Sequence, residues 1–167
     1  NIEGSAFADT LNGNNDANLI VGGAGVDILD GKGGDDTLSG GAGADTLTGG
    51  LGDDALDGGD GDDTLIGGAG ADGFSGGAGV DTVSYANATA GVEVSLEFGG
   101  SGGEASGDSF ATDIEALTGS AYNDRLGGYV GQAAILNGGA GNGILRAGEG
   151  GARLDGGLGV GTVDYSQ

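Results

Sequence analysis

The sequence contains no cysteine, no histidine and no proline among its 167 residues. Without cysteine there are no disulfides and no thiolate metal sites. Without histidine, the commonest ligand of transition metals and the commonest general base are also missing. The absence of proline excludes collagen and proline-rich disorder. A metal site in this chain must therefore be built from hard oxygen ligands, namely carboxylates and carbonyls.

Positive charge is scarce as well. Lys32 and the arginines Arg125, Arg146 and Arg153 stand against 26 acidic residues, which gives a formal net charge of −22. This balance argues against nucleic acid as a partner. No apolar run approaches the roughly 20 residues of a membrane helix, so no membrane span is expected. Because so many aspartates repel one another in a compact chain, either the chain stays unfolded or cations, most simply divalent ones, hold the fold together.

What the chain has in abundance is glycine, at 45 residues, arranged in a repeat. From Gly4 to Ser84 the sequence divides into nine units of nine residues without an insertion. Position one is always glycine, and position six is aspartate except for Asn18 in the second unit. Position eight is always apolar, and its residues are Leu11, Ile20, Leu29, Leu38, Leu47, Leu56, Leu65, Phe74 and Val83.

A period of nine with one apolar residue fits neither a helix face nor a long alternating strand. It predicts a strand of about three residues at positions seven to nine, with the central side chain pointing inward. The six preceding residues would form a turn in which glycine permits positive φ. Two units would close one coil, and stacked coils would bury the apolar column. The fold predicted is all-β, a parallel β-roll or β-solenoid with two nine-residue units per coil.

Units such as GGAGADTLT at residues 40–48 and GGDGDDTLI at residues 58–66 resemble the RTX nonapeptide GGxGxDxUx, and the resemblance covers residues 4–84. It implies a calcium-binding β-roll whose cofactor is several Ca²⁺ ions. It also implies a fragment of a larger bacterial protein, exported by type I secretion and located outside the cell or on its surface. Folding is expected to follow calcium binding after export, because the carboxylates converge only in the coiled state.

In proteins of this family, a turn and its same-side neighbour two units later share each ion. The first turn offers the carbonyls of positions two and four, the second offers those of positions one and three, and both offer the aspartate. On one side of the roll, the implied sets are Gly23, Gly25 and Asp27 with Gly40, Ala42 and Asp45; Gly41, Gly43 and Asp45 with Gly58, Asp60 and Asp63; and Gly59, Gly61 and Asp63 with Gly76, Ala78 and Asp81. On the other side they are Lys32, Gly34 and Asp36 with Gly49, Leu51 and Asp54; and Gly50, Gly52 and Asp54 with Gly67, Ala69 and Asp72.

The remaining polar positions carry weaker expectations. Asp9 is expected to bind calcium weakly and Asn18 only marginally. The additional acids at position five, Asp35, Asp53 and Asp62, are either outer ligands or solubilising charges, and the second alternative is favoured.

After Ser84 the period breaks. Residues 85–118 form an insert with short strands, in which Val92, Val94 and Leu96 alternate as strand residues do. Residues 119–167 are a second, degenerate block that keeps the apolar column but mostly lacks the aspartates. Its inward residues are predicted to be Leu126, either Ile135 or Leu136, Leu145, Leu154 and Val163. Asp124 is the one ligand expected to survive there, so few or no ions are expected.

These observations favour a structural or interaction module of a secreted or surface-exposed protein, of the adhesin, surface-layer or filament type. Extracellular polysaccharide or other copies of the protein would be its partners. The alternative is an accessory repeat module of a secreted enzyme such as an alginate epimerase, protease or lipase. Catalysis within the segment itself is not expected, because each well-placed aspartate is committed to metal.

Overall fold

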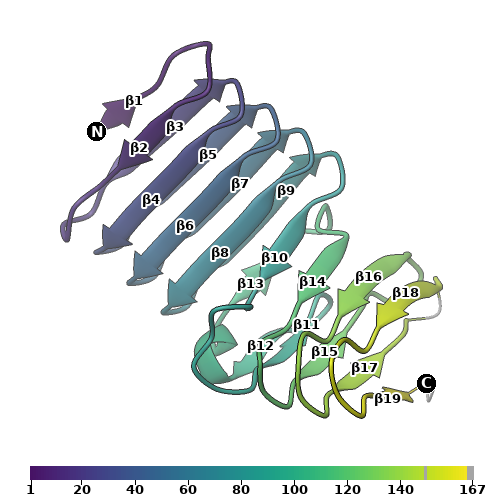
Figure 1. Ribbon diagram of the computed structural model, residues 1–167. Coiled ribbons are helices and arrows are strands. Elements are labelled where there is room, and N and C mark those ends of the chain that lie inside the picture. Colours follow the sequence, from purple (N-terminus) through teal and green to yellow (C-terminus); the bar gives the residue numbers. More distant parts are fainter. Residues whose placement is uncertain (149, 165–167) are drawn as a thin grey trace.

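The computed structural model describes residues 1–148 and 150–164. As predicted, the fold is an all-β solenoid of short parallel strands with almost no helix (Figure 1). The one short 3₁₀ helix in the described residues, η1, spans Gly103–Ala105. Nowhere in these residues is a helix long and apolar enough to cross a membrane.

The strands form three sheets that make up the walls of the solenoid. Sheet A contains β1 (Ile2–Glu3), β3 (Leu19–Ala24), β5 (Thr37–Ala42), β7 (Ala55–Asp60), β9 (Gly73–Ala78) and β13 (Ser109–Phe110). Sheet B contains β2 (Thr10–Asn12), β4 (Ile28–Gly33), β6 (Thr46–Leu51), β8 (Thr64–Ala69), β10 (Thr82–Ser84), β14 (Ala116–Thr118), β16 (Ala134–Asn137) and β18 (Ala152–Asp155). Sheet C contains β12 (Gly99–Gly102), β11 (Glu93–Ser95), β15 (Arg125–Gly127), β17 (Ile144–Arg146) and β19 (Thr162–Asp164).

The register confirms two units per coil, because Leu38 of β5 pairs with Leu56 of β7, eighteen residues later. The predicted strand length was wrong. Strands β3 to β9 each contain six residues, and the extended backbone includes positions one to three of the following unit. Gly41 at position two has a φ of 108° and pairs with Gly59 of the next coil, so the ladder continues where a turn was expected. The turn itself is therefore confined to positions four to six.

The core is a column of apolar side chains between sheets A and B. From Ile20 onward, the position-eight residues of the first block are at most 3% exposed, and Leu11 at the open end is partly buried. Burying one such side chain contributes about 1.5–3 kcal/mol. The predicted inward column is confirmed.

The insert continues the same walls. Strand β14 pairs directly with β10 in sheet B, and β13 pairs with β9 in sheet A, where the rings of Phe74 and Phe110 stack with centroids 5.4 Å apart. Val92, Val94 and Leu96 are buried, as their alternation predicts. Strand β11 of the insert then pairs with β15 and begins sheet C. Sheet B thus extends without interruption across the insert and into the second block.

In the second block Leu126, Leu136 and Leu145 are buried, and Leu154 is partly buried against them. Leu136 rather than Ile135 points inward. Val163 pairs in register with Leu145 but is 41% exposed, because β19 is the last strand of sheet C. The expected column is therefore confirmed, except that its final member is not covered.

Candidate metal sites in the turns

The position-six aspartates stack in two columns, one along each line of turns. Asp27, Asp45, Asp63 and Asp81 follow the strands of sheet A, and Asp36, Asp54 and Asp72 follow those of sheet B. All seven side chains are at most 3% exposed. Within each column, the Oδ1 atom of one aspartate accepts the backbone N–H of the aspartate one coil earlier, over 2.7–2.9 Å. One carboxylate oxygen of each residue is thus fixed by the fold.

The other oxygen has a different environment. In Asp27, Asp36, Asp45, Asp54, Asp63, Asp72 and Asp81, Oδ2 is buried and has no hydrogen-bond partner within residues 1–148 and 150–164. We refer to these as the seven unpartnered Oδ2 atoms. A buried neutral acceptor without a hydrogen-bond partner destabilises the fold by about 1–3 kcal/mol, and a charged one destabilises it more. A cation bound between the coils would supply the missing partner at each of the seven positions.

Glycine at position one makes room for that ligand. A Cβ placed on Gly40 would lie 2.5 Å from Asp45 Oδ2 and 2.6 Å from the carbonyl oxygen of Gly58 in the next coil. A side chain at position one would therefore collide with both oxygens. A carboxylate oxygen and a carbonyl oxygen from successive coils converge on the same point, which suits a hard cation with oxygen ligands.

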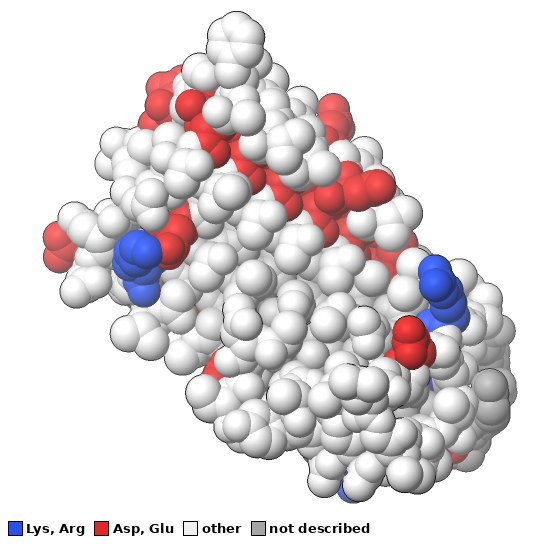
Figure 2. Space-filling view, in the orientation of Figure 1, with Lys and Arg blue, Asp and Glu red and all other residues white. Residues whose placement is uncertain are grey.

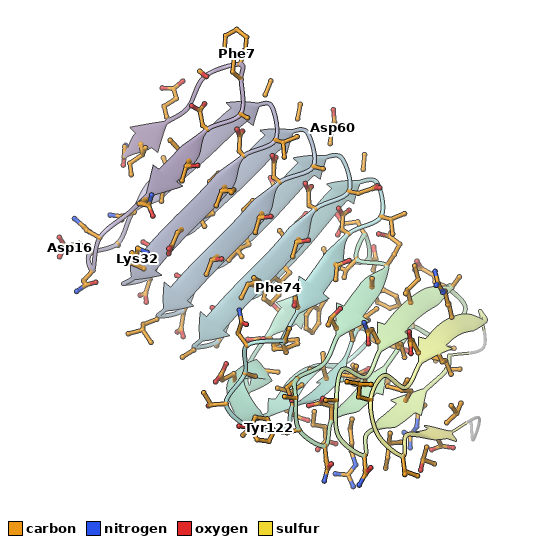
Figure 3. The ribbon with its side chains drawn as sticks, viewed as in Figure 1. Phe7, Asp16, Lys32, Asp60, Phe74 and Tyr122 are labelled. Atoms are coloured by element: carbon orange, nitrogen blue, oxygen red, sulfur yellow. The ribbon has the colours of Figure 1, made fainter. Side chains whose placement is uncertain are left out.

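Positions two and four require a left-handed backbone. Gly23 and Gly25, for example, have φ values of 112° and 134°, and the same alternation recurs in the later units. Lys32 is the one non-glycine residue with positive φ in the described part of the chain, at 80°. Its ammonium forms an ion pair with Asp30 at the surface. Lys32 and Asp60 mark opposite turn edges of the first block (Figure 3).

Burial raises the pKa of five of the column aspartates, Asp45, Asp54, Asp63, Asp72 and Asp81. Desolvation, with repulsion from neighbouring carboxylates, raises the pKa of Asp54 and Asp63 to about 6 and that of Asp72 to about 7. The pKa values of Asp45 and Asp81 are raised for the same reasons. Without a cation, the charged form of each column is disfavoured, and a divalent ion between the turns would reverse this. Figure 2 shows a row of acidic side chains along one edge of the first block.

Among the described residues, no group of three or more acidic side chains is placed so that it could hold a metal ion by itself. A cation in these turns would therefore rely on backbone carbonyls in addition to one carboxylate from each of two coils. The structure places the residues of each predicted set in adjacent coils, as the pairing of β5 with β7 and of β6 with β8 shows. Which of these atoms bind calcium stays a prediction.

Two of the predicted ligands already have protein partners. Asp9 Oδ2 accepts the backbone N–H and the hydroxyl of Ser5, over 2.6 and 2.8 Å. In the second block, Asp124 accepts both groups of Ser120 and also the N–H of Val92, each over 2.7–2.8 Å. Serine replaces glycine at position two in both turns. Its N–H and hydroxyl donate to the carboxylate, which in the other turns would need a cation as its partner. These two turns are satisfied without metal.

The second unit is satisfied in the same way. Asn18 Oδ1 accepts the N–H of Asn14, and its amide group donates to the side chain of Asn14. The first coil therefore has protein hydrogen bonds at both of its turns.

The acids at position five have a role that the sequence did not suggest. Asp35 accepts the N–H of Asp53, Asp53 that of Ala71, and Asp62 that of Val80, each from the next coil over 2.8–3.0 Å. In the second block Asn123 and Asn142 accept equivalent bonds without charge. The sequence feature that could have predicted these contacts is the recurrence of Asp or Asn at position five in successive coils.

The insert contributes two acids that have no place in the nonapeptide pattern. Asp108 Oδ1 accepts the N–H of Asp72, and Glu115 Oε2 accepts that of Asp81, both over 2.9 Å. They therefore continue the two aspartate columns. Asp108 Oδ2 also accepts the hydroxyl of Tyr85 over 2.5 Å. In the sequence, each of these acids stands two residues before an apolar residue, in DSF at 108–110 and EAL at 115–117, as the position-six aspartates do. Both segments lie outside the nine-residue period, so the pattern alone did not identify them.

Comparison with known families gives one result. The RTX calcium-binding nonapeptide repeat matches four times, at residues 1–29, 21–56, 30–65 and 48–83. No curated protein matches the chain.

Proposed function

Because residues 1–83 belong to the RTX calcium-binding nonapeptide repeat family, we propose that this calcium-binding module is a structural or interaction part of a bacterial protein that acts outside the cell. In this proposal the first block winds into a rod when it meets calcium after export. The parent protein would be of the adhesin, surface-layer or filament type.

The observation that carries the proposal is the set of seven unpartnered Oδ2 atoms. Each lies beside a position-one glycine and faces the next coil, and the net charge of −22 opposes compaction without cations. Metal binding and folding are therefore coupled. Extracellular calcium modules of low affinity have dissociation constants of about 10⁻⁴–10⁻³ M, so such a rod would stay loaded where calcium is millimolar and unwound where it is scarce.

A structural role also fits the way in which the described acids are used. The column aspartates, the position-five acids and Glu115 all bridge successive coils. Their raised pKa values recur along a ladder and do not single out one acid and base in a cleft. We therefore propose a module without catalytic activity of its own.

The accessory module of a secreted enzyme is the second candidate. The observation that favours it is a groove of about 810 Å³ on sheet C, lined in part by Phe98, Arg125, Val130 and Arg146. Glu93, Glu97 and Asp164 also line this groove, and Arg146 already pairs with Asp164 over 3.0 Å, so a saccharide carboxylate would be contacted mainly through Arg125, with the exposed ring of Phe98 in the same groove. Two results would favour this candidate over the first. One is a catalytic domain encoded in the same gene, and the other is loss of polysaccharide binding by this module when Arg125 and Arg146 are replaced by alanine.

The test is circular dichroism of the chelated protein during a calcium titration, with a count of bound ions. We expect the β signal to rise with calcium and to remain low with Mg²⁺, which requires near-ideal octahedral geometry and gives up water reluctantly. Because Asp124 in the second block already has hydrogen-bond donors from Ser120, we expect a smaller β signal to persist in chelator. A complete β spectrum in chelator, or a folded protein that binds no calcium, would refute the proposal.

A further inference from the structure

The last turn of the first block, residues 76–81, has no nonapeptide above it, yet it has the features of a metal site. Asp81 is fully buried, and its Oδ2 is one of the seven unpartnered atoms. In the regular turns the unpartnered Oδ2 faces the following coil, as it does where Asp63 Oδ2 and the carbonyl of Gly76 both lie close to Gly58. The turn that Asp81 Oδ2 faces is residues 111–115 of the insert.

The insert places a carbonyl oxygen where the next nonapeptide would have placed one. A Cβ on Gly76 would lie 2.4 Å from the carbonyl oxygen of Asp113 and 2.5 Å from Asp81 Oδ2. The corresponding distances at Gly58 are 2.7 Å to the carbonyl of Gly76 and 2.3 Å to Asp63 Oδ2. The carbonyl of Asp113 therefore replaces that of a position-one glycine.

The side chain of Asp113 holds this carbonyl in place. Its Oδ1 accepts the N–H of Gly76 over 3.1 Å, and its Oδ2 accepts the hydroxyl of Ser75 over 3.2 Å. Both carboxylate oxygens of Asp113 are thus engaged with β9, and the backbone oxygen remains directed at the space beside Gly76.

Glu115 replaces the aspartate of the missing unit. Phe110 pairs with Phe74 and Ala116 with Thr82, so the insert covers in six residues the path that the regular unit covers in eight. Glu115 then lies opposite Asp81 and accepts its N–H through Oε2, which is the bond that aspartate Oδ1 accepts elsewhere in the column. The longer side chain of glutamate compensates for the shorter turn. Glu115 is partly buried in this position.

We propose that an additional calcium ion binds between residues 76–81 and residues 111–115, held by the carboxylates of Asp81 and Glu115 and the carbonyl of Asp113. This inference rests on the proposed function, because it extends the calcium column by one site. Burial raises the pKa of Asp81, and repulsion from Glu115, Asp113 and Asp62 raises it further, so these carboxylates gather negative charge beside the buried Oδ2 that a dication would neutralise. Glycine carbonyls of the turn and water would complete the six to eight oxygens that calcium prefers.

The opposite column ends differently, which provides an internal comparison. There the insert contributes Asp108, whose Oδ2 accepts the hydroxyl of Tyr85. Beside Gly67, the corresponding glycine, the ring of Phe74 approaches the Cβ position to 2.8 Å. A neutral phenol and an aromatic ring occupy this end, so the extra ion is assigned to one column only.

The test compares Glu115→Gln with Glu97→Gln by counting calcium ions per folded chain with native mass spectrometry. Glu97 is a matched control, because its Oε2 also accepts a distant backbone N–H, that of Val130 over 3.0 Å, but it lies in the insert outside both aspartate columns. We expect Glu115→Gln to lose one ion relative to the unchanged protein and Glu97→Gln to lose none. Equal counts in both variants would overturn the junction site alone, whereas an unchanged protein without calcium would overturn the proposed function as well.

A second measurement does not depend on replacing Glu115. The hydroxyl of Tyr129 donates to the carbonyl of Ala111 over 2.5 Å, and its pKa is raised to about 12 by burial and by the charges of Asp113 and Glu115. Terbium bound at the junction would therefore emit when Tyr129 is excited. We expect Tyr129→Phe to lose part of this emission at an unchanged ion count, and Tyr122→Phe, at an exposed turn, to retain it. Emission unaffected by Tyr129→Phe would overturn the assignment.

Discussion

Replacing Asp63 with asparagine should change stability in opposite directions with and without calcium. The amide oxygen can still accept the N–H of Asp45, a bond of 2.8 Å, so the backbone connection between coils is kept. What is lost is the negative charge at Oδ2. With calcium present a ligand disappears, and in chelator a repulsive, desolvated charge disappears. The variant should therefore be less stable than the unchanged protein in calcium and more stable in chelator.

The size of the loss in calcium follows from mass action. A site with a dissociation constant of about 10⁻⁴–10⁻³ M, in ~10 mM calcium, stabilises the fold by about 1.4–2.7 kcal/mol. Asp63 faces both Asp45 and Asp81 in its column, so it borders two turn-to-turn spaces. We expect Asp63→Asn to lose at least the contribution of one site.

The matched control is Asp62→Asn. It removes the same charge one residue earlier, and its amide oxygen can still accept the N–H of Val80, a bond of 2.9 Å. Asp62 is exposed and is not among the unpartnered acids, so its variant should lose less than about 0.5 kcal/mol in calcium. Urea unfolding of both variants, in calcium and in chelator, gives the four free energies required. Equal effects of the two substitutions in calcium would refute a specific role for the Asp63 carboxylate.

Two further predictions follow from the same geometry. Gly40→Ala should lower the free energy of unfolding by about 1–3 kcal/mol and weaken calcium binding, because its Cβ would lie 2.5 Å from Asp45 Oδ2. Gly73→Ala is the control and should be tolerated, because no atom lies nearer than 3.8 Å to its Cβ position. Equal costs in thermal or urea unfolding would contradict the steric argument. In chelator, the metal-free fold should gain stability as the pH falls from about 7 to about 4. The pKa values of Asp54, Asp63 and Asp72 are about 6, 6 and 7 in the folded state and near 3.9 in the unfolded state. The folded state therefore binds more protons in that pH range. In calcium the trend should reverse because protons compete with the ion, and identical melting profiles in both buffers would contradict the raised pKa values.

Much of this architecture follows directly from the period of the sequence. Position eight specified the buried column, position six the aspartate columns, and the eighteen-residue coil followed from two units. The length of the strands could not be read in the same way. Glycine at positions one to three suggests a turn from composition alone, whereas in the solenoid Gly41 pairs with Gly59 and remains in the ladder.

The contributions of the insert were beyond a periodic analysis. Asp108, Asp113 and Glu115 act through their alignment with Asp72, Gly76 and Asp81, and that alignment depends on how a long loop folds back onto the first block. Ser5 and Ser120 were visible as departures from glycine at position two. Their meaning required the observation that serine donors satisfy the aspartate of the same turn.

The continuity of sheet B has a consequence for the behaviour of the protein when calcium is withdrawn. Strand β14 is paired on one side with β10 of the first block, for which we propose calcium-dependent folding, and on the other with β16 of the second block, where Ser120 hydrogen-bonds Asp124. If the first block unwinds, the amide and carbonyl groups of Ala116–Thr118 that face β10 become an open strand edge. Such an edge is a template for pairing with another chain. Under the proposed calcium dependence, depletion of calcium would thus expose a strand edge through which copies of the chain could associate.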